Sequence, residues 1–199
     1  MLSQNSFLTG QLSAPCWFVG AMTDGADQTN RFIDEGIWEH NFDDNSRVLA
    51  QVRSIQTGER IAIKAAYVKK HGLDFETGGN TVSVMAIKAT GVIAETMGDG
   101  RRLRVHWQRV SPLREWYFYT YQPTIWKVTP GDWKTDALID FAFQNKPQDI
   151  DRSATTPTGG NALAPIPKST SASVGHVSTR PLPMGCSIHC LIFGTIAAP

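Results

Sequence analysis

Five segments between residues 59 and 129 carry the patterns of β-strands, and they constrain the fold more than any other feature of this sequence. They read ERIAIKAAYV, TVSVMAIKATGVIAET, RRLRVHWQRV, EWYFYTY and TIWKVT. In RRLRVHWQRV apolar and charged side chains alternate, which is typical of a strand with one buried and one solvated face. Asp99-Gly100 predicts a hairpin turn, and Gly91 predicts a bend or bulge. The segments therefore predict a curved, mostly antiparallel sheet.

Other segments add one strand and three helices to this sheet. Residues 16–21 (CWFVGA) predict a short buried strand, and residues 45–58 (NSRVLAQVRSIQTG) predict an amphipathic helix. Residues 29–40 (TNRFIDEGIWEH) begin as a helix, but Gly36 favours a bend before Trp38. Residues 132–144 predict a closing helix capped by the first residue, an aspartate. The predicted fold class is α+β, with a small curved mixed sheet or barrel of five to six strands flanked by helices.

The chain divides into three predicted parts. Residues 1–13 are expected to be a flexible N-terminus, residues 14–150 a folded domain, and residues 151–199 a low-complexity tail. Ser, Thr, Pro, Gly and Ala make up 29 of the last 48 residues, without any periodicity. Such a composition buries too little apolar surface to offset chain entropy, so we expect a disordered C-terminal tail.

Charge and cysteine content limit the classes of protein that this chain can belong to. The formal net charge is +1, which argues against a protein that coats DNA over its whole surface. Three cysteines do not make a disulfide framework and predict a reducing compartment. The chain has neither a secretory signal pattern nor an apolar run of about 18 residues. We therefore expect a cytoplasmic protein without a membrane partner.

Motifs for catalysis and for metal binding are missing from the sequence. There is no P-loop, no G-x-S-x-G and no H-E-x-x-H pattern. The C-terminal CSIHC motif lacks the second ligand pair that a tetrahedral zinc site requires. The acidic pairs Asp34-Glu35 and Asp43-Asp44 are typical of solvated surface. The sequence predicts a non-enzymatic protein with no cofactor and no metal.

Aromatic and basic residues are the remaining candidates for function. Residues 114–126 read REWYFYTYQPTIW, and strand alternation sends Trp116 and Tyr117 to opposite faces. Trp107 lies among arginines, and Tyr67 precedes Lys69 and Lys70. A base that stacks on such a ring gains about 1–3 kcal/mol, and nearby cations hold phosphates. Burial in the core is the ordinary alternative for each of these rings.

Several ordered blocks resemble a known family. CWFVGA, FIDEGIWEH, GERIAIKAAYVKK, VSVMAIKATGVI, DGRRLRVHW and REWYFYTYQPTIWKV together resemble the EVE-like N-terminal domain of restriction AAA+ proteins related to the modified-cytosine restriction GTPase. That domain belongs to the PUA-like superfamily, which includes YTH and ASCH domains. The resemblance covers residues 14–150. It implies a PUA-like mixed β-barrel with helices and an aromatic pocket for an altered base.

The resemblance also implies which residues would form the site. Trp17 and the turn after Val19 would form one wall, Trp38 would be a stacking ring, and Tyr67 would lie at a pocket position. Together with the aromatic candidates above, the modified-base residues are Trp17, Trp38, Tyr67, Trp107 and Tyr117. The candidates for the nucleic-acid backbone are Lys64, Lys69, Lys70, Arg102 and Arg104. The family's SEP-like tripeptide is replaced here by GAM at residues 20–22, which changes the expected hydrogen bonds to the base.

The predicted function is recognition of 5-methyl- or 5-hydroxymethylcytosine in DNA, flipped into the pocket, within a restriction or defence system. Relatives continue into an AAA+ motor, whereas here a low-complexity sequence follows, so AAA+ GTPase or ATPase and nuclease subunits would be separate partners. Three alternatives remain open from the sequence. They are a PUA-like module that reads modified RNA, an adaptor that recruits an AAA+ partner through its tail, and an ASCH-like hydrolase.

Overall fold

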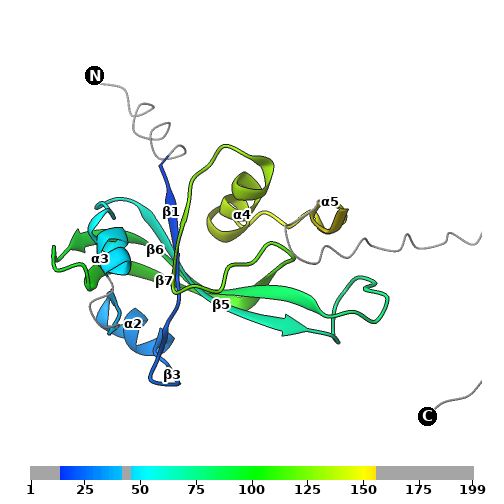
Figure 1. The fold of residues 1–199 in the computed structure, drawn as a ribbon, viewed down its shortest axis with the longest axis horizontal. Helices are drawn as coiled ribbons and strands as arrows, with labels where there is room; N and C mark the ends of the chain where they lie inside the picture. Colours follow the sequence, from blue (N-terminus) through cyan, green and yellow to red (C-terminus); the bar gives the residue numbers. More distant parts are fainter. Residues whose placement is uncertain (1–13, 42–45, 156–199) are drawn as a thin grey trace, which may run out of the picture. The chain divides into compact units, whose positions relative to one another are not determined.

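A computed structural model describes residues 14–41 and 46–155, all within the first of two compact units, residues 1–167. The chain forms a curled six-stranded mixed sheet with a few helices (Figure 1). The strands are β1 (Cys16–Val19), β4 (Ile37–Glu39), β5 (Arg60–Lys69), β6 (Val82–Thr96), β7 (Arg102–Tyr117) and β8 (Ile125–Val128), in the order β4-β7-β6-β5-β1-β8. Strands β2 (Met22–Thr23) and β3 (Ala26–Asp27) form a separate two-stranded ribbon. The helices are α2 (Thr29–Glu35), α3 (Ser46–Arg53), α4 (Trp133–Gln144) and α5 (Ile150–Thr155).

The sheet is antiparallel except where β1 pairs in parallel with β5. The register aligns Trp17, Ile61, Gly91 and Trp107 in one row across four strands. A Cβ atom at Gly91 would lie 2.6 Å from the carbonyl oxygen of His106 and 3.0 Å from the Trp107 ring, so only glycine fits this close approach. The predicted bend is present in modified form, because two register shifts flank Gly91 rather than coincide with it.

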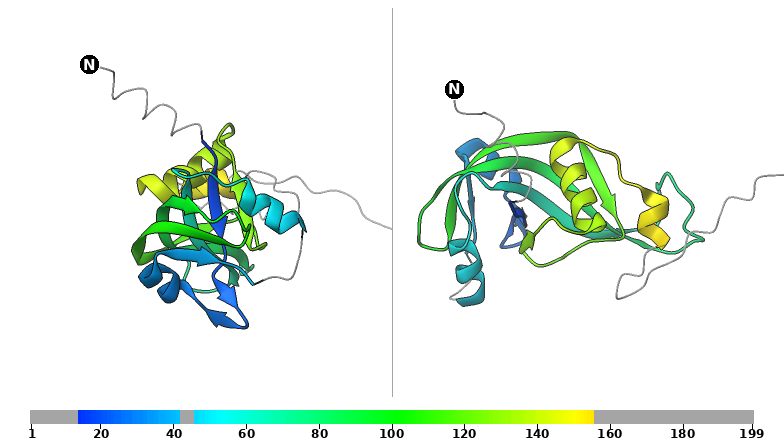
Figure 2. Two further views of the ribbon diagram at one scale, coloured as in Figure 1. Left: turned by 90° about the vertical axis from the view of Figure 1, so that its left-hand side faces the viewer. Right: turned by 90° about the horizontal axis from the view of Figure 1, so that it is seen from above.

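Both faces of the sheet are covered, by different helices. One core contains buried side chains of β1, β5, β6 and β7 together with residues of α2 and α3. The other contains the opposite face of β1, parts of β5 to β8, and α4. Figures 1 and 2 show α2 and α3 toward one end of the sheet and α4 and α5 toward the other. Because β1 is buried on both faces, its run of apolar residues has no alternation.

The turn at Gly36 decides which way the next residues point. Gly36 adopts a left-handed conformation with φ 65°, and its N–H donates to the carbonyl oxygen of Ile33 at 3.3 Å. This ends α2 and starts β4, which pairs with β7 and sends Trp38 into the core. The bend predicted before Trp38 is thus confirmed.

The N-terminus of α4 has the aspartate cap that the sequence predicts. The Asp132 carboxylate accepts hydrogen bonds from the backbone N–H groups of Lys134 (2.8 Å) and Thr135 (3.1 Å), and the Thr135 hydroxyl accepts one from the Asp132 N–H. The hydrogen bond from the Thr135 backbone is the main cause that lowers the pKa of Asp132. This is a complete capping box.

We expect Asp132→Ala to lower the free energy of unfolding by about 1 kcal/mol, because two N–H groups lose their acceptor. Urea denaturation followed by circular dichroism measures the change. Asp132→Ser is the matched control, since a serine hydroxyl also caps and should retain most of the stability. Equal midpoints for the alanine variant and the wild type would contradict the role of this cap.

The structure departs from the predicted elements at several places. Strand β4 and the β2–β3 ribbon were not predicted as strands. EWYFYTY is not a separate strand, because β7 runs unbroken to Tyr117 and then ends where Phe118 takes φ 69°. Helix α5 extends to Thr155, so the first five residues of the predicted tail, 151–155, are helical. The remainder of that tail, residues 156–199, and the segment 1–13 lie outside the described residues. No helix among the described residues has both the length and the apolar character needed to cross a bilayer.

Candidate functional site

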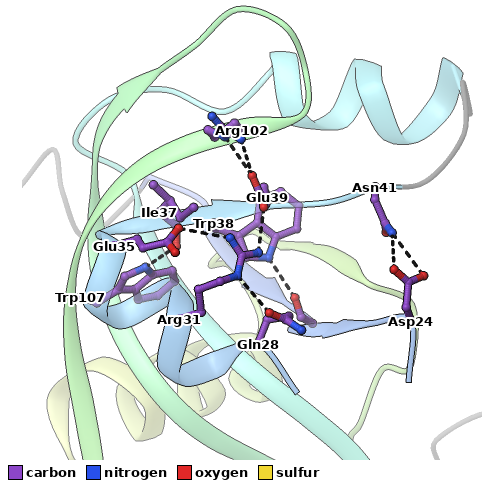
Figure 3. A network of polar contacts seen from close by, with 11 residues as sticks. Asp24, Gln28, Arg31, Glu35, Ile37, Trp38, Glu39, Asn41, Arg102 and Trp107 are labelled. Atoms are coloured by element: carbon purple, nitrogen blue, oxygen red, sulfur yellow. Dashed lines mark hydrogen bonds and ion pairs between the residues drawn. The ribbon is translucent and has the colours of Figure 1, made fainter. Parts of the chain in front are cut away.

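A polar pocket of about 390 Å³ opens between the β2–β3 ribbon, α2, the end of β4 and the turn that joins β6 to β7. We call it the Glu39 pocket. Its lining consists of Thr23, Arg31, Glu39, His40, Asn41, Asp99, Arg101 and Arg102. Figure 3 shows part of this network around Glu39. The volume lies within the range of pockets that hold small organic ligands.

Backbone contacts hold the pocket's walls in place. The N–H of His40 donates to the carbonyl oxygen of Arg101 at 3.2 Å, which ties the chain after β4 to the β6–β7 turn. The Asn41 amide donates to the carboxylate of Asp24 at 3.3 Å and so closes the side of the ribbon. Because these segments are far apart in sequence, only the folded chain assembles this pocket.

The centre of the pocket is one carboxylate between two guanidinium groups (Figure 3). Arg31 Nη2 lies 2.8 Å from Glu39 Oε1, and Arg102 Nη2 lies 2.7 Å from Glu39 Oε2. Arg31 is oriented further by Gln28, whose side-chain oxygen accepts from Nε at 3.0 Å, and by Glu35 at 3.2 Å. Three arginines and two carboxylates line the pocket, and Glu35 also pairs with Arg31, so these charges balance.

The two carboxylates of the pocket stay ionised at neutral pH. Burial alone would raise the pKa of Glu39, but hydrogen bonds from Arg31 and Arg102 outweigh it and lower that pKa. Burial would also raise the pKa of Asp99, but hydrogen bonds from the backbone of Arg101 and Arg102 outweigh it and lower that pKa. An ionised carboxylate only accepts hydrogen bonds, so Glu39 suits a ligand edge that carries an amino group. The arginines supply donors for a carbonyl or a phosphate oxygen.

The tryptophans expected to wall a base pocket are in the core instead. Trp17 and Trp38 have no exposed surface. The Trp17 indole donates to Glu59 at 2.7 Å, and the Trp38 indole donates to the carbonyl oxygen of Gly20 at 2.9 Å. Neither ring offers a face to a base in this structure, because each fills the interior between the sheet and its helices. Trp38 nevertheless lies next to the pocket, since the following residue, Glu39, points the other way along β4.

Trp107 is partly buried beside the same core. Its indole donates to the carbonyl oxygen of Ile37 at 2.8 Å, in the row of side chains that crosses Gly91. The ring thus braces β4 against β7. It does not line the Glu39 pocket.

Three other predicted residues meet around Glu115, at a different part of the sheet. The hydroxyls of Tyr67 and Tyr117 donate to its carboxylate at 2.5 and 2.7 Å, and Lys69 Nζ lies 2.7 Å away. Burial would raise the pKa of Glu115, but these contacts outweigh it and lower that pKa to about 2. Burial is the main cause that raises the pKa of Tyr67 to about 12, and the hydrogen bond to the Glu115 carboxylate adds to it.

This Glu115 cluster lies far from Trp107 along the sheet. Tyr117 pairs with Val84, whereas Trp107 pairs with Gly91. Seven residues of strand span roughly 23 Å at about 3.3 Å per residue. The predicted aromatic residues therefore do not converge on one cavity.

The residues predicted to contact phosphates also lie at different places in the fold. Arg102 lines the Glu39 pocket, while Arg104 is exposed and lies 3.4 Å from Glu95. Lys70 is exposed just after β5. Lys64 is 3% exposed, and its ammonium donates to the carbonyl oxygen of Pro123 at 2.9 Å, so the structure does not present it to a phosphate. Of the ten predicted site residues, only Arg102 lines this pocket.

Most of the pocket was not predicted from the sequence. Arg31 lies in a predicted helix, and no motif marks it. Glu39 and Asn41 follow the predicted bend, where no strand was predicted, so the alternation along β4 that separates Glu39 from Trp38 was not visible in the sequence. Among residues 14–41 and 46–155, no group of three metal-ligating side chains gathers. The CSIHC motif lies outside the described residues.

Neither a scan of known protein-family models nor a search of curated proteins gives a match to this chain.

Proposed function

We propose that residues 14–150 form a PUA-like, EVE-like domain that binds DNA and recognises a modified cytosine flipped into the Glu39 pocket. The base would carry a 5-methyl or 5-hydroxymethyl group. The domain has no catalytic role of its own and serves a cytoplasmic restriction or defence system, with an AAA+ GTPase or ATPase and a nuclease as partners. The resemblance of the ordered blocks supports the family, and the curled mixed sheet with helices on both faces is compatible with it.

The observation that carries this proposal is the pairing of Glu39 with Arg31 and Arg102 inside a pocket of about 390 Å³. Carboxylates accept hydrogen bonds from the N4 amino group of cytosine, and arginine donates to carbonyl and phosphate oxygens. Extruding a base costs a few kcal/mol, which charge-assisted hydrogen bonds of about 1.5–3 kcal/mol each can offset. Recognition in this form depends on polar contacts to the base edge, with Trp38 as a buried support for the strand that carries Glu39.

The test compares a plain DNA duplex with a modified one of the same sequence. In the modified duplex one central cytosine is replaced by 5-methylcytosine or 5-hydroxymethylcytosine. We expect the full chain to bind the modified duplex at least about fivefold more tightly in fluorescence anisotropy. Glu39→Gln and Arg102→Ala should each weaken binding of the modified duplex, because they take away the charged acceptor for the N4 amino group or one of its positioning donors. Arg109→Ala is the matched control, since it deletes an exposed arginine of the same strand outside the pocket.

Equal affinity of the wild type for modified and plain duplexes would refute the proposal. Tighter binding to the matched modified RNA would reassign the domain to RNA. The same titration at two salt concentrations separates phosphate contacts from base contacts, because only the former are strongly salt-dependent.

A further inference from the structure

A second pocket of about 320 Å³ lies between α3 and residues 121–125, which lead into β8. We call it the Tyr121 pocket. It shares no lining residue with the Glu39 pocket. Its polar wall contains Arg47, Gln51 and Tyr121, and its apolar wall contains Val48, Pro123 and Ile125. A pocket with an aromatic ring, a cation and an amide fits a flat, polar, phosphate-bearing ligand.

Tyr121 is placed as a stacking surface. Its side chain is 39% exposed, and its ring lies 5.1 Å from the Trp126 ring at an interplanar angle of 32°. Trp126 in turn contacts Phe18 at 5.7 Å and Tyr119 at 5.3 Å. The Tyr121 ring is therefore supported from behind by fixed aromatic side chains. A supported ring loses little conformational entropy when a ligand stacks on it.

The backbone around this ring is held from beneath. Lys64 Nζ donates to the carbonyl oxygen of Pro123 at 2.9 Å, with that of Gln122 at 3.4 Å. The N–H of Gly20 donates to the carbonyl oxygen of Thr124 at 2.7 Å. These contacts give the buried Lys64, which the sequence marked as a phosphate contact, a different role. It positions the segment that carries Tyr121.

Backbone groups of one residue, Gly20, make hydrogen bonds next to both pockets. The N–H of Gly20 holds Thr124 in the Tyr121 pocket, while its carbonyl oxygen accepts from the indole of Trp38, the neighbour of Glu39. The Gln51 side-chain amide makes no hydrogen bond to another described residue, which leaves it available for a base edge.

We propose that the Tyr121 pocket binds an unstacked nucleobase of the same nucleic acid. Tyr121 stacks on that base, Gln51 bonds its edge, and Arg47 lies near the adjoining phosphate. Amide side chains pair with base edges in this way, and stacking on an aromatic ring tolerates any base. This inference rests on the proposed function for the identity of the first base. It adds a second subsite that raises affinity without reading the modification.

The experiment uses the full chain and a fluorescent single-stranded DNA decanucleotide, together with the modified and plain duplexes above. We expect Tyr121→Ala to weaken binding of the decanucleotide about fivefold or more, and Tyr121→Phe to bind as the wild type does. On the duplexes, Tyr121→Ala should lower both affinities by the same factor and leave their ratio unchanged. Leu113→Ala, at another exposed apolar side chain, is the control.

The outcomes separate this subsite from the proposed function. If the wild type binds both duplexes equally, the reading of a modified base fails, while the decanucleotide result still decides the Tyr121 pocket. Unchanged binding by both Tyr121→Ala and Gln51→Ala overturns the subsite. If Tyr121→Ala does not fold, Gln51→Ala still tests the subsite. Gln51 is a partly exposed residue of α3, so its replacement by alanine should leave the fold intact. A loss in Tyr121→Ala that Tyr121→Phe does not restore would also overturn it, because stacking needs only the ring.

Discussion

Replacing Trp38 by alanine is expected to lower the free energy of unfolding by about 3–5 kcal/mol, because it leaves a large cavity in the core. The side chain is completely buried, packs with residues of β1, β6 and β7, and donates to the carbonyl oxygen of Gly20. Urea denaturation, followed by circular dichroism, measures the loss. Such a loss is a large part of the stability of a typical domain.

Two variants separate stability from recognition at this position. Trp38→Phe keeps most of the apolar volume but loses the indole hydrogen bond. We therefore expect it to lower the free energy of unfolding by only about 1–2 kcal/mol. Trp133→Ala is the control for loss of an indole, since that ring is partly exposed and should cost less. If Trp38→Ala unfolds at the wild-type midpoint, the side chain is not part of the core. Weak DNA binding by Trp38→Ala alone would not identify a stacking ring.

Lys64 makes the stability of the fold depend on pH in the alkaline range. Burial of its ammonium lowers the pKa from 10.5 to about 8. Between these two values the unfolded chain binds a proton that the folded chain does not, so the free energy of unfolding rises with pH. The destabilising cost of the buried charge is fully present below pH 8 and is lost as pH rises to 10.5. We expect the wild type to gain about 2–3 kcal/mol relative to Lys64→Met between pH 7 and pH 10.

The difference between the two proteins is the quantity to measure, because other groups act in the same range. Burial raises the pKa of Cys16 to about 11, which lowers stability as pH rises from 9. This contribution is common to the wild type and the variant and cancels. Lys70→Met removes an exposed ammonium just after β5, and its pH profile should run parallel to that of the wild type. A parallel profile for Lys64→Met would show that this ammonium is hydrated in the folded state.

Much of the fold could be predicted because local patterns and tertiary contacts agree. The alternation in residues 101–110 matches β7, where Leu103 and Val105 are buried and Arg102 and Arg104 are exposed. The Asp132 cap and the turn at Gly36 follow from backbone chemistry that acts within a few residues. The end of β7 could not be predicted, because only the positive φ of Phe118 stops the alternation that REWYFYTYQPTIW suggests.

The candidate site was predicted far less well. Aromatic residues signal either a core or a binding surface, and sequence alone does not distinguish these outcomes. Trp17 and Trp38 proved to be core, and Tyr67 and Tyr117 bind the Glu115 carboxylate. The opening between the ribbon, β4 and the β6–β7 turn depends on residues of ordinary types, and so no motif marked it. The residues proposed to contact a base are therefore the polar side chains of the Glu39 pocket and not a cage of aromatic rings.

By itself the sequence determined the long strands β5 and β6, the helices and which side of β7 is apolar, since these depend on neighbours along the chain. Tertiary structure alone decided which buried faces meet, and hence that Arg31, Glu39 and Arg102 share one pocket and that Tyr121 is exposed above Trp126. The reason is physical. Register across the sheet joins residues tens of positions apart, and no local pattern encodes that pairing.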